Sequence, residues 1–333
     1  MSGSDSTGGE AVWVRAAAPA SVSNVCCGFD LLGFAIAGWQ DVVEARRSPE
    51  PGVRLLEVSG DDGRLPRNPE ENTAGVAVAK LLELLGWTGG GAPGVELRLH
   101  KVLPLASGLG SSGASAVAAL VATDEALGLG ADEARLLAAA MEGERVACGA
   151  AHPDNVAPTL HGGLLLVRPG EAPGEPPELT ELPVPDGLTC VLLHPHSEVA
   201  TQAARAVLPV EVPVSTLTAQ AGNLAALVTG LFRGDDGLIS AALVDLVAEP
   251  VRADMTPGFA GVRRAALAAG ALGGGLSGSG PTMFAWTREP EQAERVAEAM
   301  RRALERDTGL DGDLLISPVG ARGARVVADG EPL

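Results

Sequence analysis

Residues 101–115, KVLPLASGLGSSGAS, decide how the rest of the chain is interpreted. Before them, apolar and polar residues alternate from Val95 to His100, which is typical of a half-buried strand; after them, residues 114–127 form an apolar run rich in helix formers. The glycines therefore mark a strand-to-helix turn. A helix that begins at Ser111 directs unpaired N–H groups and a positive dipole end toward this turn. We expect an anionic oxygen ligand there, although a plain helix cap after a flexible connection would use the same glycines.

Two common nucleotide-binding motifs are absent. Neither lysine, Lys80 nor Lys101, follows a glycine as GxxxxGK[ST] requires, and there is no GxGxxG. The remaining pattern, PxxxGLGSSxAS, resembles the phosphate loop of the GHMP small-molecule kinases. That resemblance implies ATP binding by Lys101, Pro104, Leu105, Ala106, Ser107, Gly108, Leu109, Gly110, Ser111, Ser112, Gly113, Ala114 and Ser115.

The composition limits the class of protein and its partners. A chain of 333 residues with 46% hydrophobic and 20% charged residues is long enough for two globular domains. A net charge of −18 without a basic patch argues against a nucleic-acid partner. The first ten residues lack the pattern of a secretion signal, and no run of about 18 apolar residues suggests a membrane span. We therefore expect a cytoplasmic protein with a disordered start over residues 1–10.

The four cysteines show no metal-binding or CxxC spacing. Adjacent Cys26 and Cys27 would form a strained disulfide, so we expect free thiols. A nucleophilic role for either one is the alternative, which the absence of a neighbouring histidine disfavours.

Residues 14–36, VRAAAPASVSNVCCGFDLLGFAI, resemble the signature APxSxANLGxGFDxxGxA of the homoserine-phosphorylating members of the GHMP family. The first strand is expected over residues 12–18, where Pro19 would break it. The resemblance implies that Asn24 and Asp30 reach an amino-acid substrate. From the residues alone both are also ordinary Asx-turn residues. Val25, Cys26 and Cys27 depart from the family pattern.

Two further segments carry candidate ligands. A helix over residues 72–87 places Asn72 either as its N-cap or, by the resemblance, near the adenine. Residues 142–163, EGERVACGAAHPDNVAPTLHGG, resemble the family pattern ExxxxxGxxHxDNxAPxxxGG. By that resemblance Glu144 ligates Mg²⁺ together with Ser112, or with Ser111 as the alternative. It also implies that the substrate pocket is lined by His152, Asp154 and Asn155, whereas a solvated surface charge is the plain alternative for Glu144.

The second half supplies three residues that match the family's receptors for a substrate carboxylate. Thr201 and Arg205 lie four residues apart on one face of a predicted helix, and Arg252 follows in a proline-bounded turn that would display it to solvent. Arginine donates two parallel hydrogen bonds to a carboxylate. The turn SGSGPT at 277–282 resembles the third family motif, which supports the phosphate loop; a tight hairpin is the alternative.

Taken together, the resemblance implies an α+β, two-domain GHMP kinase fold. We expect an ATP-binding domain like ribosomal protein S5 domain 2 over residues 11–170, a Pro- and Glu-rich linker over 171–187, and a ferredoxin-like domain over 188–333.

The implied reaction transfers a phosphoryl group from ATP, with Mg²⁺, to the hydroxyl of L-homoserine, the step before threonine is made. Asn24, Asn155 and Glu144 would be catalytic, and Asn155 would orient the hydroxyl without acting as a base. Another GHMP kinase, acting on mevalonate or shikimate, or a non-catalytic metabolite sensor are the alternatives. A homodimer is a further hypothesis.

Overall fold

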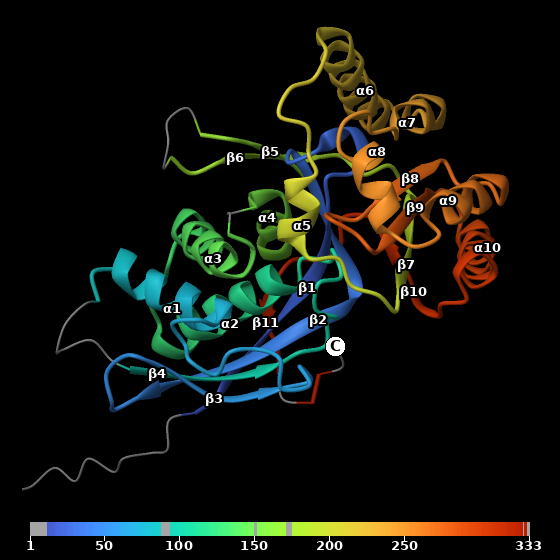
Figure 1. Cartoon of the computed structure of the whole chain (residues 1–333). Helices are drawn as coiled ribbons and strands as arrows, with labels where there is room; N and C mark the ends of the chain where they lie inside the picture. The colour runs from blue at the N-terminus through green and yellow to red at the C-terminus, as the bar shows by residue number, and fades with distance from the viewer. Residues whose placement is uncertain (1–11, 88–93, 150–151, 171–174, 329, 332–333) are drawn as a thin grey trace, which may run out of the picture.

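The computed structural model describes residues 12–87, 94–149, 152–170, 175–328 and 330–331, apart from the side chain of Cys148. The chain forms two β-sheets, each covered by helices (Figure 1). The expected disordered start at 1–10 lies outside the described residues. Among the described helices, none has both the length and the apolar composition that crossing a bilayer requires.

The larger sheet has the strand order β11-β1-β2-β4-β3, and β5 and β6 extend it from β2. Its strands are β1 (Val14–Ser23), β2 (Leu32–Ser48), β3 (Val53–Ser59), β4 (Gly94–His100), β5 (Leu164–Arg168), β6 (Glu178–Leu182) and β11 (Arg325–Val326). The helical elements within the same part of the chain are η1 (Cys26–Gly28), α1 (Thr73–Leu84), α2 (Ser111–Leu127), α3 (Glu133–Cys148) and α4 (Pro153–His161).

Helix α2 is the central element of this first part. It packs against β1 and β2 on one side and against α1 and α3 on the other. Because it is enclosed in this way, its apolar residues are distributed all around the helix rather than on one face, and most of them are buried. The N-terminus of α2 is therefore held firmly by the core, at the point where the phosphate loop ends.

The smaller sheet is antiparallel, with the order β10-β7-β9-β8. Its strands are β7 (Thr189–Pro195), β8 (Gly273–Leu276), β9 (Met283–Thr287) and β10 (Gly312–Pro318). The helical elements in this part are α5 (Thr201–Ala206), α6 (Val214–Arg233), α7 (Asp236–Ala242), α8 (Glu249–Arg252), η2 (Ala253–Met255), α9 (Phe259–Ala268) and α10 (Pro290–Thr308). Helices alternate with these strands as β-α-β-β-α-β, so the expected ferredoxin-like topology is confirmed.

An aromatic cluster joins the two sheets. Phe34 on β2 meets Phe284 and Trp286 on β9, with ring centroids 6.3 and 5.7 Å from that of Phe34. All three rings are buried in one shared core. Edge-to-face contacts of this kind fix the orientation of the two sheets, and so of any site between them.

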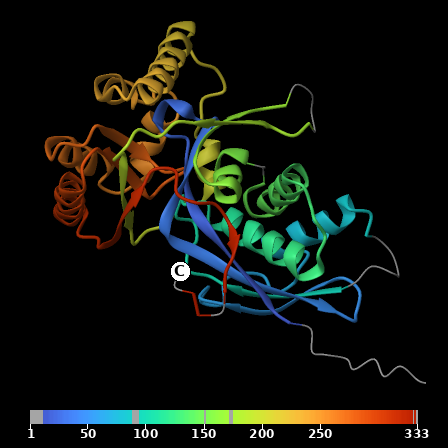
Figure 2. The same ribbon diagram turned by 180° about the vertical axis from the view of Figure 1, so that it is seen from behind.

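Three expectations about the chain are wrong. Strand β1 continues through Pro19 because its register with β2 shifts between Pro19 and Ser21, and an irregularity of this kind accommodates a residue without an N–H. Within the predicted linker, residues 178–182 form edge strand β6 on β5, where polar side chains can face solvent. The second domain was expected to extend over residues 188–333, but the last part of the chain returns to the first sheet, where β11 pairs with β1 (Figure 2).

Candidate active site

A cavity of about 400 Å³ lies between the two parts of the chain. Its walls come from the phosphate loop, from α3 and α4, from the loop before β2, and from α5, α8 and the turn between β8 and β9. Of the predicted site residues, those that line it are Asp30, Lys101, Leu105, Ala106, Ser107, Gly108, Gly110, Ser111, Ser112, Ser115, Glu144, His152, Asp154, Asn155, Thr201, Arg205 and Arg252. The predicted residues Asn24, Asn72, Pro104, Leu109, Gly113 and Ala114 are not part of this lining.

The phosphate loop is held by the turn at 277–282. Ser277 Oγ donates to the carbonyl oxygen of Gly108 over 2.7 Å, and Thr282 Oγ1 donates to that of Ser107 over 2.7 Å. Gly108 has φ 77°, and a Cβ there would lie 2.3 Å from the carbonyl oxygen of Ser277. Only glycine fits this close approach without strain. The turn also joins two paired strands, so both interpretations of SGSGPT are correct.

Lys101 lies beneath the loop in a buried network. Its Nζ forms an ion pair with Asp41 and donates to Ser111 Oγ over 2.7 Å and to Ser115 Oγ over 3.0 Å. Asp41 also accepts the backbone N–H groups of Val102 and Leu103, each at 3.0 Å. The network therefore ties the start of the loop to β2 and to the first turn of α2. Lys101, which was predicted to bind cofactor, lines the cavity and also supports the loop through its ammonium.

Glu144, Ser112 and Asn155 form a second polar cluster. Ser112 Oγ donates to Glu144 Oε2 over 2.6 Å, and Asn155 Nδ2 donates to Glu144 Oε1 over 3.1 Å. Glu144 is 1% exposed, so it is not the solvated surface charge that a lone helical glutamate usually is. Oδ1 of Asn155 is buried and has no hydrogen-bond partner in the described part of the chain. The cluster thus presents oxygen atoms to a ligand beside the N-terminus of α2.

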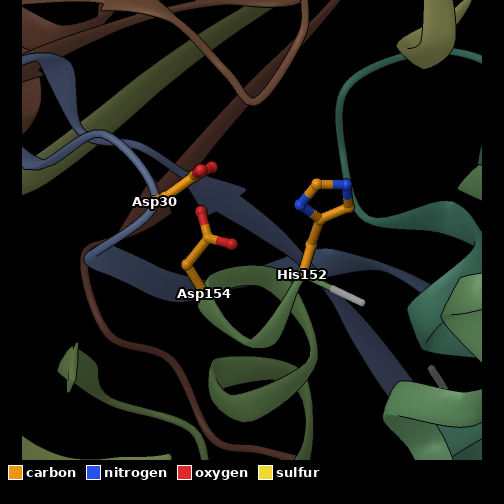
Figure 3. A group of neighbouring side chains, drawn as sticks. All are labelled: Asp30, His152 and Asp154. Carbon is orange, nitrogen blue, oxygen red and sulfur yellow. The ribbon is translucent and has the colours of Figure 1, made fainter. Parts of the chain in front are cut away.

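A third cluster that lines the cavity is charged. Figure 3 shows Asp30, from the loop before β2, facing Asp154 and His152 from the start of α4. One ligand atom from each residue lies within 4.8 Å of the other two. The Arg205 guanidinium donates to both carboxylate oxygens of Asp30, each at 2.9 Å. These residues were predicted from separate segments, and the fold brings them together.

Burial changes the protonation of this third cluster. Loss of solvent, with a smaller effect of the Asp30 charge, raises the pKa of Asp154 to about 7. Burial, assisted by Arg205, lowers the pKa of His152 below its usual value. At neutral pH the imidazole is therefore uncharged and the Asp154 carboxyl is divided between its two forms.

Asn24 and Arg252 have positions that differ from the expectation, and Asn72 follows one of its two interpretations. Asn24 Nδ2 donates to the carbonyl oxygen of Gly278 and its Oδ1 accepts the N–H of Asp30, so Asn24 positions Asp30 from behind. Asn72 caps α1 through Ala74 and is 2% exposed, which is the structural alternative for this residue. Arg252 is 4% exposed instead of displayed to solvent, because carbonyl oxygens of α5 and of the turn after β8 accept from its guanidinium.

Several lining residues were not predicted. They are Ser23, Leu65, Thr73, Ala147, Ala200, Gln202, Gly278 and Ser279. Most of these side chains are small or apolar and carry no chemical signal of their own. Only their position next to a motif residue could have indicated that they line the cavity.

The described cysteines Cys26, Cys27 and Cys190 are free, as expected, and buried. Burial raises the pKa of Cys27 to about 12 and raises that of Cys26. This leaves both without the thiolate a nucleophile needs.

The fold and the cavity define a small-molecule kinase, and the chain belongs to the GHMP kinase family. The profile for the GHMP kinases N terminal domain matches residues 72–163, and that for the GHMP kinases C terminal domain matches residues 224–306. The first match contains the phosphate loop and Glu144, and the second contains Arg252. The expected two-domain GHMP kinase fold is thereby confirmed.

Among similar proteins, a homoserine kinase from Chlorobium phaeobacteroides is 47% identical over 94% of this chain and 99% of its own length. A homoserine kinase from Xanthomonas campestris is 38% identical over 94% of each chain. The crystal structure of homoserine kinase from Cytophaga hutchinsonii has 43% identity and a TM-score of 0.89 over 95% of this chain and 97% of its own. A galactokinase from Lactococcus lactis, at 13% identity and a TM-score of 0.67, shares the fold alone.

Proposed function

We propose that this protein catalyses ATP-dependent phosphorylation of the hydroxyl of L-homoserine to O-phospho-L-homoserine, the step before threonine is made. One observation carries the proposal: a single cavity is lined both by a phosphate loop and by a cluster of carboxylate and guanidinium groups. An α-amino acid carries one ammonium and one carboxylate, which these groups can receive. The names of the relatives support the same substrate. We propose a cytoplasmic location, because ATP and L-homoserine are both metabolites of the cytoplasm.

The oxygen cluster at the phosphate loop fits Mg²⁺. Hard divalent cations take carboxylate, hydroxyl and amide oxygens, and the buried Oδ1 of Asn155 without a partner suggests that a ligand completes this region. Ser112 and Glu144 would hold the ion, which when bound neutralises charge on the transferring phosphoryl group. Ser111 is the weaker candidate because its Oγ is turned to Lys101 and to the carbonyl oxygen of Leu103.

The remaining catalytic contribution is positioning. N–H groups of the phosphate loop would hold the nucleotide phosphates, while Thr201, Arg205 and Arg252 would receive the substrate carboxylate. Asp30 would receive the ammonium, with Asn24 holding Asp30 in place. Asn155 would hydrogen-bond the hydroxyl, whose proton passes to the γ-phosphoryl group, since a loose transition state needs little deprotonation of the nucleophile.

A coupled assay of ADP release tests the substrate. Homoserine should support turnover, and mevalonate, shikimate and galactose should not, because none of them carries an ammonium for Asp30. Turnover with one of those three and not with homoserine would assign a different GHMP activity. ATP binding without turnover of any of them would favour a metabolite sensor.

We also propose that the protein is a homodimer, with helix α6 as the interface. Of the 20 residues of α6, only Leu227, Gly230 and Leu231 are buried, and Arg233 is its only charged residue. Val214 and Leu217 are 78% and 58% exposed. A helix whose single charge lies at its last residue, on a chain with net charge −18, favours a second copy of itself, since its exposed apolar turns carry no charge that repels the copy. Light scattering should show a dimer that Leu217→Glu converts to a monomer; a monomeric wild type would contradict this.

A further inference from the structure

The charged end of the cavity already contains an ion pair in the free protein. Arg205 and Asp30 both line the cavity, and the pair is bidentate. Their side chains are 37% and 40% exposed, so water reaches both partners. In the free protein, the guanidinium and the carboxylate therefore bind each other at the place where a ligand with both charges would bind.

A second pair of charges lies next to the first. Asp154 acts on Asp30 as a neighbouring carboxylate, and Arg252 acts on Arg205 as a neighbouring guanidinium. The two guanidinium carbons lie 5.7 and 5.2 Å from the ring centroid of Phe29. Arg252 is fixed by two backbone carbonyl oxygens, whereas Arg205 is the exposed member of the two. Any rearrangement in this group of charges therefore involves Arg205.

We propose that the Asp30–Arg205 ion pair is exchanged, charge for charge, for the zwitterion of the substrate, and that this exchange excludes ligands carrying only one of the two charges. The proposal rests on the proposed function and adds to it the basis of amino-acid selectivity. In the exchange Asp30 passes from the guanidinium to the substrate ammonium, and Arg205 passes from Asp30 to the substrate carboxylate.

The exchange is inexpensive because the pair is half exposed. Solvated ion pairs contribute little, so separating this one costs no more than about fivefold in affinity. A zwitterion replaces both contacts at once. The position of Asp30 does not depend on Arg205. Asn24 accepts the backbone N–H of Asp30, whose φ is 55°, so the Asp30 carboxylate can stay in place when the guanidinium moves.

A ligand with a single charge cannot make the same exchange. A carboxylate alone would take Arg205 and leave Asp30 unpaired beside Asp154. An ammonium alone would take Asp30 and leave Arg205 unpaired beside Arg252. Each case brings two like charges together without a partner, which is unfavourable when solvent is limited. The selectivity therefore exceeds what one lost hydrogen bond would give.

The test compares ligands that lack one charge, by titration calorimetry of the full chain with ADP present. 4-Hydroxybutyrate lacks the ammonium of homoserine, and 3-aminopropan-1-ol lacks the carboxylate. In Asp30→Asn, Arg205 is released from its partner, so the affinity for 4-hydroxybutyrate should be at least about fivefold higher than that of the wild type. In Arg205→Met, 3-aminopropan-1-ol should likewise gain affinity. Asparagine tolerates the left-handed backbone of position 30, so the first variant should fold.

Asp154→Asn is the matched control at pH 8, where Asp154 is ionised. It removes one negative charge from the same cluster without touching the ion pair, so 4-hydroxybutyrate should gain less affinity than in Asp30→Asn, where Arg205 is also released. Equal gains in Asp30→Asn and Asp154→Asn would show simple repulsion and overturn the exchange. No gain in Asp30→Asn would overturn it too. Both results leave the proposed function intact if wild type phosphorylates homoserine; absence of that turnover would refute the function instead.

Discussion

Two ion pairs each contribute at least one side chain to the lining of the same cavity, and they differ chiefly in burial. Lys101 and Asp41, beneath the phosphate loop, have side chains 1% and 0% exposed, whereas Arg205 and Asp30 are 37% and 40% exposed. The buried pair also holds two serines and two backbone N–H groups. A ligand cannot replace a pair that is enclosed in this way, but it can replace one that water already reaches. Burial thus distinguishes a support for the nucleotide end from an exchangeable contact at the amino-acid end.

The largest expected effect is on the support. Lys101→Met should lower the free energy of unfolding by about 3–5 kcal/mol, because Asp41 is left buried without its countercharge. Chemical denaturation measures this. Lys80→Met is the matched control, since Lys80 pairs with Glu83 on the surface of α1, with side chains 30% and 60% exposed. Its loss should stay within about 1 kcal/mol. Similar losses in both variants would contradict the distinction.

Removal of the carboxylate beside the phosphate loop should have the next largest effect, on turnover. Glu144→Ala takes away a proposed Mg²⁺ ligand and the partner of Ser112 and Asn155. Its kcat should fall at least about a hundredfold, roughly 2.7 kcal/mol, because the interaction acts mainly in the transition state. Circular dichroism should show that the variant remains folded. A near-normal kcat would remove Glu144 from the proposed metal site.

The exchangeable pair should affect substrate use and leave stability nearly unchanged. Arg205→Met should lower kcat/KM for homoserine by about 1.5–3 kcal/mol, the value of a charge-assisted contact, with little change in KM for ATP. Its free energy of unfolding should change by less than about 1 kcal/mol, because the pair with Asp30 is half exposed. Steady-state kinetics and denaturation separate the two effects. An equal loss for both substrates would mean that the nucleotide end is damaged as well.

Sequence patterns predicted those features of the fold and the site that depend only on residues close together in the sequence. The helix at Ser111, the cap at Asn72 and the shared face of Thr201 and Arg205 each depend on a few adjacent residues, and the structure agrees with all three. Contacts between distant segments were not predictable in this way. Asp41 lies 60 residues before Lys101, and Gly278 lies 254 residues after Asn24.

Those distant partners explain the errors. The supporting role of Lys101 could not be predicted without knowledge of its buried partner Asp41. An arginine in a proline-bounded turn suggests exposure unless the carbonyl oxygens that enclose Arg252 are known. The roles of the site residues in catalysis remain predictions that the variants above address.

The smallest expected effect on turnover concerns Asp154, and it decides between two mechanisms. A carboxyl group with a pKa of about 7 is well suited to act as a general base, and Asp154 lines the cavity beside Asp30 and His152. The alternative is that Asp154 only adds negative charge where the ammonium binds. Arg205, Arg252 and Asp30 are the charged groups that act on this position, and a ring nitrogen of His152 lies within 4.8 Å of it.

The two mechanisms place the ionisation in different kinetic constants. Without a base, kcat/KM for homoserine should rise as pH increases through about 7, since the ionised carboxylate favours the substrate ammonium, while kcat stays nearly flat. In Asp154→Asn that ionisation should disappear and kcat should stay within about tenfold of wild type, because a loose transition state does not require proton removal by the protein. If Asp154 were the base, kcat itself would rise through pH 7 in wild type and would fall by about 10⁴ in the variant with KM unchanged. That pattern would replace proton transfer to the γ-phosphoryl group with general-base catalysis from the amino-acid end of the cavity.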